Sequence, residues 1–254
     1  EEVQCGASQQ FMSPGISIAM IHKLPLPSDL PAVTIVGAGK LGKAVAAVWE
    51  DRGGSIAKLV TSGQTWEPKD LVFEATQPEA AAENLARCIR ARIPVVTGTT
   101  GWLDQLPEML DMSQKERSTV FYSTNFSPGI HAMNAIAKHA VDIFGQIPGY
   151  QPRIQEVHHV EKKDAPSGTA LTLAQLMKQR GWTQDMAIES IREGEVMGLH
   201  SLVWDSEHDA VVLQHEAKSR IGFAKGAVWA LCWTWQRHAQ AEFGLYTMTD
   251  LFKT

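Results

Sequence analysis

The chain has 254 residues, of which 44% are hydrophobic and 20% are charged, and its formal net charge is −5. This composition is typical of a folded globular protein and excludes a disordered chain. The negative charge offers no general attraction to nucleic acid, so binding of an anion needs a local cluster of positive groups. No apolar run reaches the roughly 20 residues that a membrane-spanning helix needs.

Cysteine usage and the first thirty residues bear on where the protein resides. Cys5, Cys88 and Cys232 lie far apart and form no C-x-x-C pair. We therefore expect no disulfide framework and no zinc ribbon, and a reducing compartment is the default. Residues 1–30 are rich in proline and lack clear periodicity, which predicts a loosely ordered extension. We expect a cytoplasmic protein; if the extension is the remnant of a targeting segment, the alternative is the stroma of a plastid-type organelle.

Strands and helices alternate between residues 31 and 126. Short apolar runs rich in β-branched residues predict strands at 33–37, 55–60, 70–75, 94–97 and 119–123. Apolar residues at helical spacing predict helices at 40–52 and 78–92. Such alternation is typical of parallel βαβ units. We therefore predict an α/β fold with a Rossmann-type doubly wound sheet and assign residues 31–126 to a dinucleotide-binding domain.

The pattern changes after residue 126. Helical spacing recurs at 128–144, 169–180 and 223–236. Strand-like runs occur at 153–159, 187–192, 198–204 and 210–216. Three of these strands follow one another without a helix between them, which is typical of an antiparallel or mixed sheet. We therefore predict a second, α+β domain over residues 127–223.

A glycine-rich loop follows the first predicted strand and opens the first predicted helix. Gly37-Ala38-Gly39-Lys40-Leu41-Gly42 reads G-x-G-x-x-G. In this motif the first glycine permits a tight turn, the second lets the backbone approach a pyrophosphate, and the third allows close packing of helix on strand. The helix N-terminus attracts phosphate, and Lys40 adds charge. A glycine turn without a ligand is the alternative, but the position within a βαβ array favours nucleotide binding.

The residue that usually selects the cofactor is missing from its expected place. An acidic residue at the end of the second strand normally binds the ribose 2′-hydroxyl, whereas this chain has Thr61 and Ser62. Their hydroxyls suit a 2′-hydroxyl or a 2′-phosphate, which favours NADPH slightly without excluding NADH. The turns Gly98-Thr99-Thr100-Gly101 and Ser123-Thr124-Asn125-Phe126 each follow a strand. We expect them at the carboxyl edge of the sheet, near the nicotinamide, although both are also compatible with ordinary turns.

Residues 156–170 read E-V-H-H-V-E-K-K-D-A-P-S-G-T-A. Adjacent residues of a strand point to opposite faces, so His158 and His159 are not expected to share a metal ion, and we predict no metal site. A surface pair of histidines is the alternative to a functional pair. Histidine titrates near neutral pH and is the commonest general acid in enzymes.

The same segment also contains groups that suit an anion. Ser167-Gly168-Thr169 opens a predicted helix, where N–H groups and hydroxyls form a cradle for a carboxylate or phosphate. A simple helix cap is the alternative. Lys162 and Lys163 add positive charge, unless both are merely solvated. Together with the glycine loop, these residues predict a nicotinamide-dependent reductase for a small dianionic substrate.

The segment 156–170 closely resembles the signature of the dihydrodipicolinate reductase (4-hydroxy-tetrahydrodipicolinate reductase) family. The similarity runs from about Val33 to Leu251 and includes Gly98-Thr-Thr-Gly101, Asn125-Phe126-Ser127, Ser190-Ile-Arg192 and Gly198-Leu-His200. It implies NAD(P)H-dependent reduction of 4-hydroxy-tetrahydrodipicolinate to tetrahydrodipicolinate in lysine and diaminopimelate biosynthesis. It also implies a homotetramer assembled through the sheet of the second domain, and a last helix that returns to the first domain, so that residues 224–254 complete it.

The resemblance implies roles for individual residues. His158 looks like the family's general acid and Lys162 like its catalytic partner. The residues that look like substrate contacts are His159, Ser167, Gly168, Thr169 and Thr100. The residues expected to contact the cofactor are Gly37, Ala38, Gly39, Lys40, Leu41, Gly42, Thr61, Ser62, Gly98, Thr99, Thr100, Ser123, Thr124, Asn125 and Phe126.

The chain departs from the family pattern at three places. Many members have a longer glycine loop, G-x-x-G-x-x-G; the acid after the second strand is absent; and the amino-terminal extension has no counterpart. Two alternative functions stay open at this point. One is a reductase of another small keto or imino dicarboxylate on the same scaffold, because a fold does not specify a reaction. The other is a non-catalytic nucleotide-binding protein.

Overall fold

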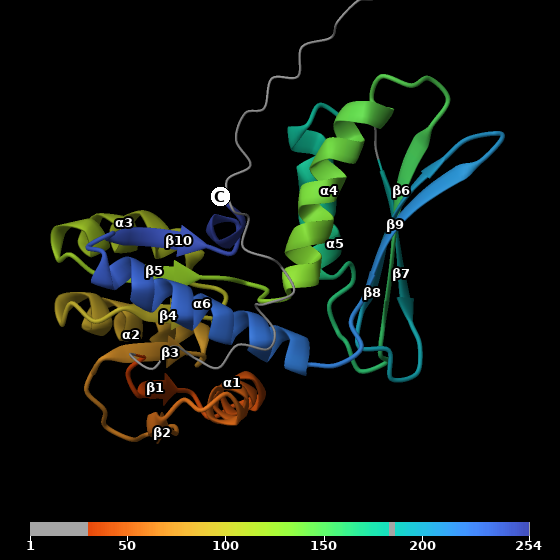
Figure 1. Ribbon diagram of the computed structural model, residues 1–254. Coiled ribbons are helices and arrows are strands. Elements are labelled where there is room, and N and C mark those ends of the chain that lie inside the picture. Colours follow the sequence, from red (N-terminus) through yellow and green to blue (C-terminus); the bar gives the residue numbers. More distant parts are fainter. Residues whose placement is uncertain (1–29, 183–185, 254) are drawn as a thin grey trace, which may run out of the picture.

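The computed structural model of the protein describes residues 30–182 and 186–253. Within these ranges the strands form two separate sheets, one of six strands and one of four (Figure 1). The predicted extension, residues 1–30, lies outside the described residues apart from Leu30. None of the helices in the described ranges is long and apolar enough to cross a membrane.

The six-stranded sheet is parallel throughout. Its strands are β1 (Val33–Val36), β2 (Ile56–Val60), β3 (Leu71–Glu74), β4 (Val95–Thr97), β5 (Thr119–Tyr122) and β10 (Gly244–Thr247). They lie in the order β10-β5-β4-β3-β1-β2. Every residue of β1 and β3 is buried, as expected for central strands that are covered on both faces. The predicted doubly wound parallel sheet is confirmed.

Helices cover both faces of this sheet. They are α1 (Lys40–Asp51), α2 (Pro78–Arg90), α3 (Leu106–Lys115) and α6 (Ile221–Ala239). Neighbouring residues of β3 point to opposite faces, so Phe73 packs with α1 and α6, whereas Val72 packs with α2 and α3. Short 3₁₀ helices lie at Leu103–Gln105 and Asp250–Phe252. We call the six-stranded sheet with α1, α2, α3 and α6 the first body.

Two elements of the first body were not predicted from the sequence. Only Met109 and Ser113 of α3 are buried, so its apolar stripe is narrow. β10 is a strand because it pairs with β5, with Gly244 opposite Thr119, after the chain has returned from the four-stranded sheet. A pairing between residues so distant in sequence leaves no local pattern.

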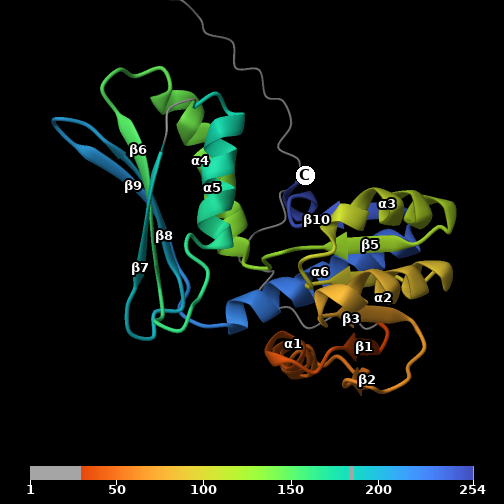
Figure 2. The same ribbon diagram turned by 180° about the vertical axis from the view of Figure 1, so that it is seen from behind.

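The four-stranded sheet and two helices form the second body. Its strands are β6 (Gln151–His158), β7 (Ala187–Arg192), β8 (Leu199–Asp205) and β9 (Ala210–Glu216), in the order β7-β6-β8-β9. β6 and β7 are parallel, and the other pairs are antiparallel, which confirms the predicted mixed sheet. α4 (Pro128–Phe144) and α5 (Gly168–Gln179) cover one face and lie between this sheet and the first body (Figures 1 and 2).

The turn between β5 and α4 is held firmly where the chain leaves the first body. Phe126 is 2% exposed and packs against Phe73 and Phe121, with ring centroids 6.0 and 6.4 Å apart. Asn125 N donates a hydrogen bond to Ser123 Oγ at 3.1 Å, and the Ser123 hydroxyl donates to Asn125 O at 2.6 Å. The aromatic anchor and these bonds fix the polar atoms of the turn relative to both bodies.

Candidate active site

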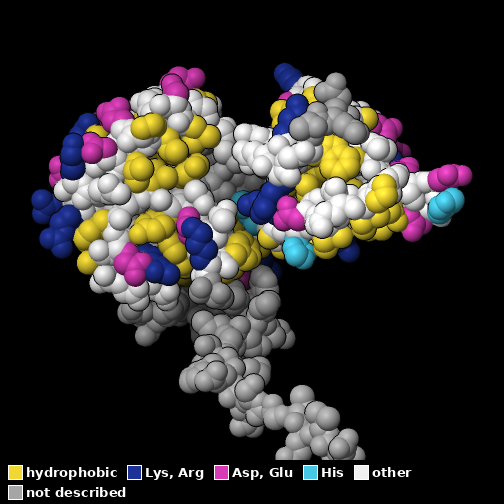
Figure 3. Space-filling model, turned by 90° about the horizontal axis from the view of Figure 1, so that it is seen from above, with side chains coloured by type: hydrophobic (Ala, Val, Ile, Leu, Met, Phe, Trp, Pro, Cys, Tyr) yellow, Lys and Arg dark blue, Asp and Glu magenta, His cyan; other side chains and the backbone are white. Residues whose placement is uncertain are grey.

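Residues of both bodies line a cavity of about 550 Å³. Its lining residues are Thr100, Thr124, Asn125, Ile130, His131, Asn134, His158, Lys162, Asp164, Ser167, Gly168, Thr169 and Thr172. Seen from above, the two bodies form two lobes, and histidine and basic side chains gather in the hollow between them (Figure 3). We call this cavity the acid-site cavity.

A second cavity of about 300 Å³ lies beside the glycine loop. Its lining residues are Lys40, Leu41, Ala44, Gly98, Ser123, Thr124, Asn125, Phe126, Met197, Arg220 and Phe223. We call it the nucleotide cavity. It shares Thr124 and Asn125 with the acid-site cavity, so the two cavities adjoin at the turn between β5 and α4. A molecule in one cavity lies beside a molecule in the other, as a bimolecular transfer requires.

The glycine loop has the geometry of a phosphate-binding turn. Gly39 is the N-cap of α1, no side chain caps this helix, and its first turn holds no acidic residue. A Cβ at Gly42 would lie 1.9 Å from Gly37 O, so only glycine fits there, whereas a Cβ at Gly39 would meet nothing within 4 Å. The first N–H groups of α1 therefore lack a side-chain acceptor and suit a pyrophosphate.

Thr61 and Ser62 lie near this loop but outside both cavities. Gly37 N donates to Val60 O at 3.1 Å, so the end of β2 adjoins the glycine loop. Thr61 and Ser62 follow immediately and are exposed, and neither lines the nucleotide cavity. Of the predicted cofactor residues, the structure brings Lys40, Leu41, Gly98 and residues 123–126 together around the nucleotide cavity. Gly37, Ala38, Gly39, Gly42 and Thr99 line neither cavity, and contacts of all these residues, and of Thr61 and Ser62, with a cofactor stay a prediction.

Hydrogen bonds to the buried Glu74 carboxylate hold the loops beside the nucleotide cavity in place, although no role was predicted for Glu74 from the sequence. Its carboxylate is fully buried at the end of β3 and accepts hydrogen bonds from the hydroxyls of Thr97 and Thr76. Thr76 N in turn donates to Thr99 Oγ1 at 2.9 Å. These bonds fix the loop that carries Thr99 and Thr100. In the sequence, this role of Glu74 is indicated only by its position as an acidic residue at the end of an apolar strand.

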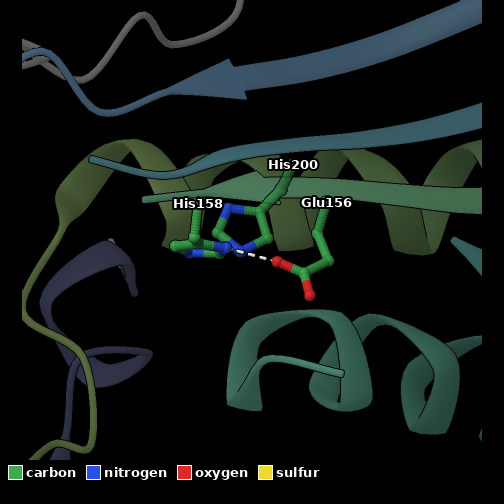
Figure 4. A group of neighbouring side chains, drawn as sticks. All are labelled: Glu156, His158 and His200. Carbon is green, nitrogen blue, oxygen red and sulfur yellow. Dashed lines mark hydrogen bonds and ion pairs between the residues drawn. The ribbon is translucent and has the colours of Figure 1, made fainter. Parts of the chain in front are cut away.

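Glu156, His158 and His200 form the buried centre of the acid site (Figure 4). β6 places Glu156 and His158 two residues apart, hence on the same face, and β8 places His200 directly opposite Glu156. His158 Nδ1 hydrogen-bonds with Glu156 Oε2, and the two imidazole rings pack edge to face with centroids 5.0 Å apart. All three residues are at most 7% exposed.

The buried Glu156 carboxylate is matched by donors on both oxygens. Oε1 accepts from the Arg192 guanidinium at 2.9 Å and from Ser167 N at 3.3 Å. Burial alone would raise the pKa of Glu156, but the neighbouring donors, Arg192 first and then Ser190 and His158, outweigh burial and hold the pKa below its ordinary value of 4.5. Glu156 is therefore ionised at neutral pH.

The two imidazoles differ in their access to the acid-site cavity. Burial lowers the pKa of His158 below 6.5, the charges of Lys162 and Arg192 lower it further, and Glu156 opposes the shift. Burial and the neighbouring His158 lower the pKa of His200 to about 4, so His200 is neutral at neutral pH. His158 lines the cavity, whereas His200 does not and instead hydrogen-bonds through Nε2 with Ser167 Oγ at 3.1 Å.

Donor atoms of Glu156, His158 and His200 lie within 4.8 Å of one another. Two imidazoles and one carboxylate are a set that divalent metals use. Here, however, Arg192 already forms an ion pair with Glu156 at 2.9 Å. A guanidinium at this distance balances the carboxylate charge and repels a cation, so we assign no metal to the cluster.

Lys162 and the start of α5 supply positive groups to the cavity. Lys162 Nζ pairs with the Asp164 carboxylate at 2.7 and 2.9 Å. Ser167 is the N-cap of α5 through its hydroxyl. Within the described ranges no hydrogen bond occupies the N–H groups of Gly168 and Thr169. These two N–H groups therefore remain for an anion, and the Lys162 ammonium, which pairs with Asp164, lines the same cavity.

One predicted substrate contact does not reach this cavity. Thr100, Lys162 and residues 167–169 line it, as does His158. His159 lies just beyond β6, is half-buried, and donates its N–H to Val196 O at 2.7 Å. It lines neither cavity, so its contact with substrate stays a prediction.

Helix α4 contributes residues to the acid-site cavity that were not predicted from the sequence. Ile130, His131 and Asn134 line the acid-site cavity from the first turns of this helix. His131 Nε2 hydrogen-bonds with Asn125 O at 2.7 Å, which ties the helix to the turn that both cavities share. The sequence offers one indication of this: residues 130 and 134 are one helical turn apart near the N-terminus of α4, so they lie on the same face of the helix.

Family models match most of the chain. Residues 61–126 match the model described as "Dihydrodipicolinate reductase, N-terminus", and residues 129–252 match "Dihydrodipicolinate reductase, C-terminus". The first match begins after the glycine loop, the segment in which the sequence departs from the family's usual spacing.

Curated relatives carry the name 4-hydroxy-tetrahydrodipicolinate reductase. The protein of Christiangramia forsetii is 33% identical over 241 residues, which cover 87% of this chain and 99% of the relative. The protein of Bdellovibrio bacteriovorus is 32% identical over 222 residues, which cover 84% of this chain and 92% of the relative.

Solved structures resemble the fold over both bodies. The dihydrodipicolinate reductase from Paenisporosarcina sp. TG-14, solved with dipicolinate bound, has a TM-score of 0.70 at 18% identity and covers 87% of this chain and 99% of its own. A probable dehydrogenase from Thermotoga maritima has a TM-score of 0.55 at 10% identity, with coverage of 87% and 92%. At these identities the likeness shows the fold alone.

The matches agree with what the geometry offers. An uncapped helix with a glycine loop, an anion cradle and a buried imidazole meet at two adjoining cavities. The family models and the relatives above 30% identity confirm the predicted family and enzyme class. The chain therefore belongs to the dihydrodipicolinate reductase (4-hydroxy-tetrahydrodipicolinate reductase) family and is an NAD(P)H-dependent oxidoreductase.

Proposed function

We propose that the protein reduces 4-hydroxy-tetrahydrodipicolinate to tetrahydrodipicolinate, with the substrate in the acid-site cavity and the nicotinamide end of NAD(P)H in the nucleotide cavity. One observation carries this assignment of cavities: they share Thr124 and Asn125. The relative solved with dipicolinate, a ring with two carboxylates, supports a cyclic dicarboxylate. The protein then acts in lysine and diaminopimelate biosynthesis.

The cofactor supplies the hydride when it is bound. The N–H groups at the start of α1, with Lys40, hold its pyrophosphate, because this helix has no side-chain cap. Gly98 and the turn at 123–126 line the nucleotide cavity and would contact the nicotinamide end. The absence of an acid after β2, where Thr61 and Ser62 stand, supports a preference for NADPH over NADH. Comparison of kcat/KM for the two cofactors tests this preference.

The substrate carboxylates bind on the second body. Lys162 and the N–H groups of Gly168 and Thr169 are the available donors, and a charged donor gives the stronger hydrogen bonds. The Thr169 hydroxyl accepts from Asn125 Nδ2 at 3.5 Å and so stands at the junction of the two cavities. Thr100 lines the same cavity from the first body. The substrate is thereby oriented toward the cofactor.

His158 is the general acid. The net reaction consumes one NAD(P)H and one proton, replaces the ring C–OH bond with a C–H bond, and releases water and NAD(P)⁺. The imidazole supplies this proton through Nε2, because Nδ1 is engaged with Glu156. Solvent then returns a proton to the ring for the next turnover.

The substitution His158→Gln tests the assignment. Substrate is generated from pyruvate and aspartate semialdehyde, and loss of absorbance by the reduced nicotinamide reports turnover. A positioned acid contributes roughly 10²- to 10⁴-fold, so we expect kcat to fall by that factor. His139→Gln, on the exposed surface of α4, is the matched control and should retain wild-type turnover. Near-normal turnover of His158→Gln would exclude the role.

We further propose how the chain is organised and where it works. Residues 31–126 with 224–254 form the nucleotide-binding domain, residues 127–223 form the substrate domain, and the protein is cytoplasmic.

The four-stranded sheet has one face, opposite α4 and α5, that no helix of the described ranges covers (Figures 1 and 2). Val212 of the edge strand β9 is 56% exposed. This open face supports a homotetramer assembled through the sheet. Light scattering should give a mass of four chains; a monomer at micromolar concentration would contradict it.

A further inference from the structure

We propose that Glu156 and Arg192 are positioning residues that hold His158 in one tautomer, with Nε2 left free for the substrate. The proposal rests on the proposed function, since it assigns a task to residues behind the general acid. Neither residue lines the acid-site cavity, so both act on catalysis through residues that do, and the proposal concerns their action through His158.

The strand register aligns the three side chains. Glu156 and His158 are two residues apart on β6 and share a face, and Arg192 is the β7 partner of His158. His158 Nδ1 hydrogen-bonds with Glu156 Oε2. An ionised carboxylate only accepts hydrogen bonds, so Nδ1 carries the proton of the neutral ring. Nε2 is then the one nitrogen that can give up and regain a proton.

The carboxylate is itself fixed by donors on its far oxygen. Glu156 is fully buried, and its Oε1 accepts from Arg192 at 2.9 Å and from Ser167 N at 3.3 Å. Oε1 therefore faces donors on one side while Oε2 faces His158 on the other. This division of the two oxygens leaves the carboxylate one orientation in which all its partners are satisfied.

Arg192 ties the acid to the loop that carries Lys162. Besides Glu156, its Nη2 donates to Asp164 O at 2.6 Å, and its Nε donates to Lys162 O at 3.3 Å. The planar guanidinium offers several donors in a rigid fork, which a lysine ammonium cannot reproduce. One side chain thus sets the position of His158, through Glu156, relative to the backbone of Lys162.

The surroundings of Nε2 are kept open. A Cβ at Gly198 would lie 3.0 Å from His158 Nε2, so the absence of a side chain there leaves room beside this nitrogen. The charged and titratable groups that face the His158 ring are Glu156, Arg192, His200 and Lys162. Among them Glu156 alone favours the protonated ring, while burial and the two cations oppose it.

Glu156→Gln tests the proposal because it inverts the hydrogen bond to His158. Arg192 and Ser167 N both donate to the Oε1 position, so the amide oxygen of glutamine should remain there and its NH₂ should face Nδ1. An NH₂ group donates hydrogen bonds, so it pairs with an unprotonated Nδ1. This places the proton of the neutral ring on Nε2 and disfavours the imidazolium form of His158, which is protonated on both nitrogens. The wrong tautomer in a comparable histidine–carboxylate pair costs about 10⁴-fold.

We expect kcat of Glu156→Gln to fall by at least about 10²-fold. KM should change little, because the residue lies behind the cavity. The alkaline limb of the pH profile should move to lower pH, since the charge that favours the protonated ring is lost. Glu156→Asp, which keeps the charge, should recover part of the turnover. Loss of turnover with an unchanged pH profile would mean a structural role and overturn the proposal.

A double variant separates this proposal from the proposed function. If Glu156 acts through His158, then His158→Gln with Glu156→Gln should be no slower than His158→Gln alone. Additive losses would overturn the positioning role but leave the role of His158 intact. A His158→Gln variant with normal turnover would instead refute the proposed function itself.

Nitrogen NMR of the His158 imidazole in the wild-type protein tests the proposal even if Glu156→Gln does not fold, because it does not use that variant. The resonance of neutral His158, assigned by comparison with His158→Gln, should report the Nδ1–H tautomer. A neutral ring protonated at Nε2 would refute the proposal directly. Dipicolinate binding and the melting temperature of each variant identify those that retain the native cavity.

Discussion

The nucleotide side and the acid side of the site are built in different ways. On the nucleotide side, the proposed binding groups are the backbone N–H groups of one short segment, residues 37–42, and the main demand on the sequence is the absence of side chains. On the acid side, β6, β7 and β8 contribute Glu156, His158, Arg192 and His200, whose charges must match one another. Backbone recognition is local, whereas charge matching depends on sheet register.

This difference leads us to expect that substitutions separate the two sides. A change in the glycine loop should weaken cofactor binding and leave dipicolinate binding intact. A change at the acid site should do the reverse. Coupling between the sides is expected only at Thr124 and Asn125, which line both cavities.

After His158→Gln and Glu156→Gln, the largest effect is expected from Gly42→Ala. The added Cβ would lie 1.9 Å from Gly37 O, so the backbone of the loop must shift. Each hydrogen bond to a charged group is worth about 1.5–3 kcal/mol, so loss of one or more loop N–H contacts should lower NADPH affinity on the order of 10²-fold. Fluorescence titration measures it. Gly222→Ala, whose Cβ meets nothing within 4 Å, is the control. Equal affinities would mean that the loop does not bind the cofactor.

The next effect is expected from Lys162→Met on the acid side. A hydrogen bond to a charged group contributes about 1.5–3 kcal/mol, so kcat/KM for the substrate should fall about 10- to 100-fold. Dipicolinate should also raise the melting temperature less than in the wild type. Lys163→Met is the matched control, because Lys163 is exposed and does not line the cavity. Similar losses in both variants would point to net charge rather than to a specific contact.

A smaller effect is expected from Thr61→Asp at the end of β2. An added carboxylate accepts from the ribose 2′-hydroxyl of NADH and repels the 2′-phosphate of NADPH. One such interaction near the surface is worth about 1–2 kcal/mol, so the ratio of kcat/KM for NADH to that for NADPH should rise about 10-fold or more. An unchanged ratio would place the adenosine ribose away from Thr61.

The smallest effect concerns the stability of the acid side as pH falls. The pKa of His200 drops from 6.5 in the unfolded chain to about 4 in the folded protein. Between these pKa values His200 binds a proton in the unfolded chain but stays neutral in the folded protein. The free energy of unfolding therefore decreases as pH falls through this window. Urea titrations at several pH values measure the slope. In His200→Gln the slope should be smaller; an identical slope would exclude this contribution.

Local sequence patterns were enough to predict the bounds of elements whose caps and hydrophobic periodicity lie within the element itself. α4 was predicted at 128–144 from its helical spacing, and it has these bounds in the structure, where Ser127 caps it and Pro128 occupies its first turn. β7 and β9 were also predicted with the bounds observed. α3 and β10 were missed, since one has a narrow buried stripe and the other owes its strand to pairing with β5.

The sequence by itself determined the parallel and mixed sheets, the glycine loop and the segment 156–170, because each is a contiguous pattern with a local physical reason. The family resemblance pointed to His158 and Lys162 as its catalytic pair. Only the tertiary structure decided which atoms meet: Glu156 with His158, Arg192 with both Glu156 and the Lys162 loop, and α4 with the shared turn. Apart from Glu156 and His158, which share β6, these contacts join residues from separate strands, helices and loops, so they exist only once the sheet register has been formed.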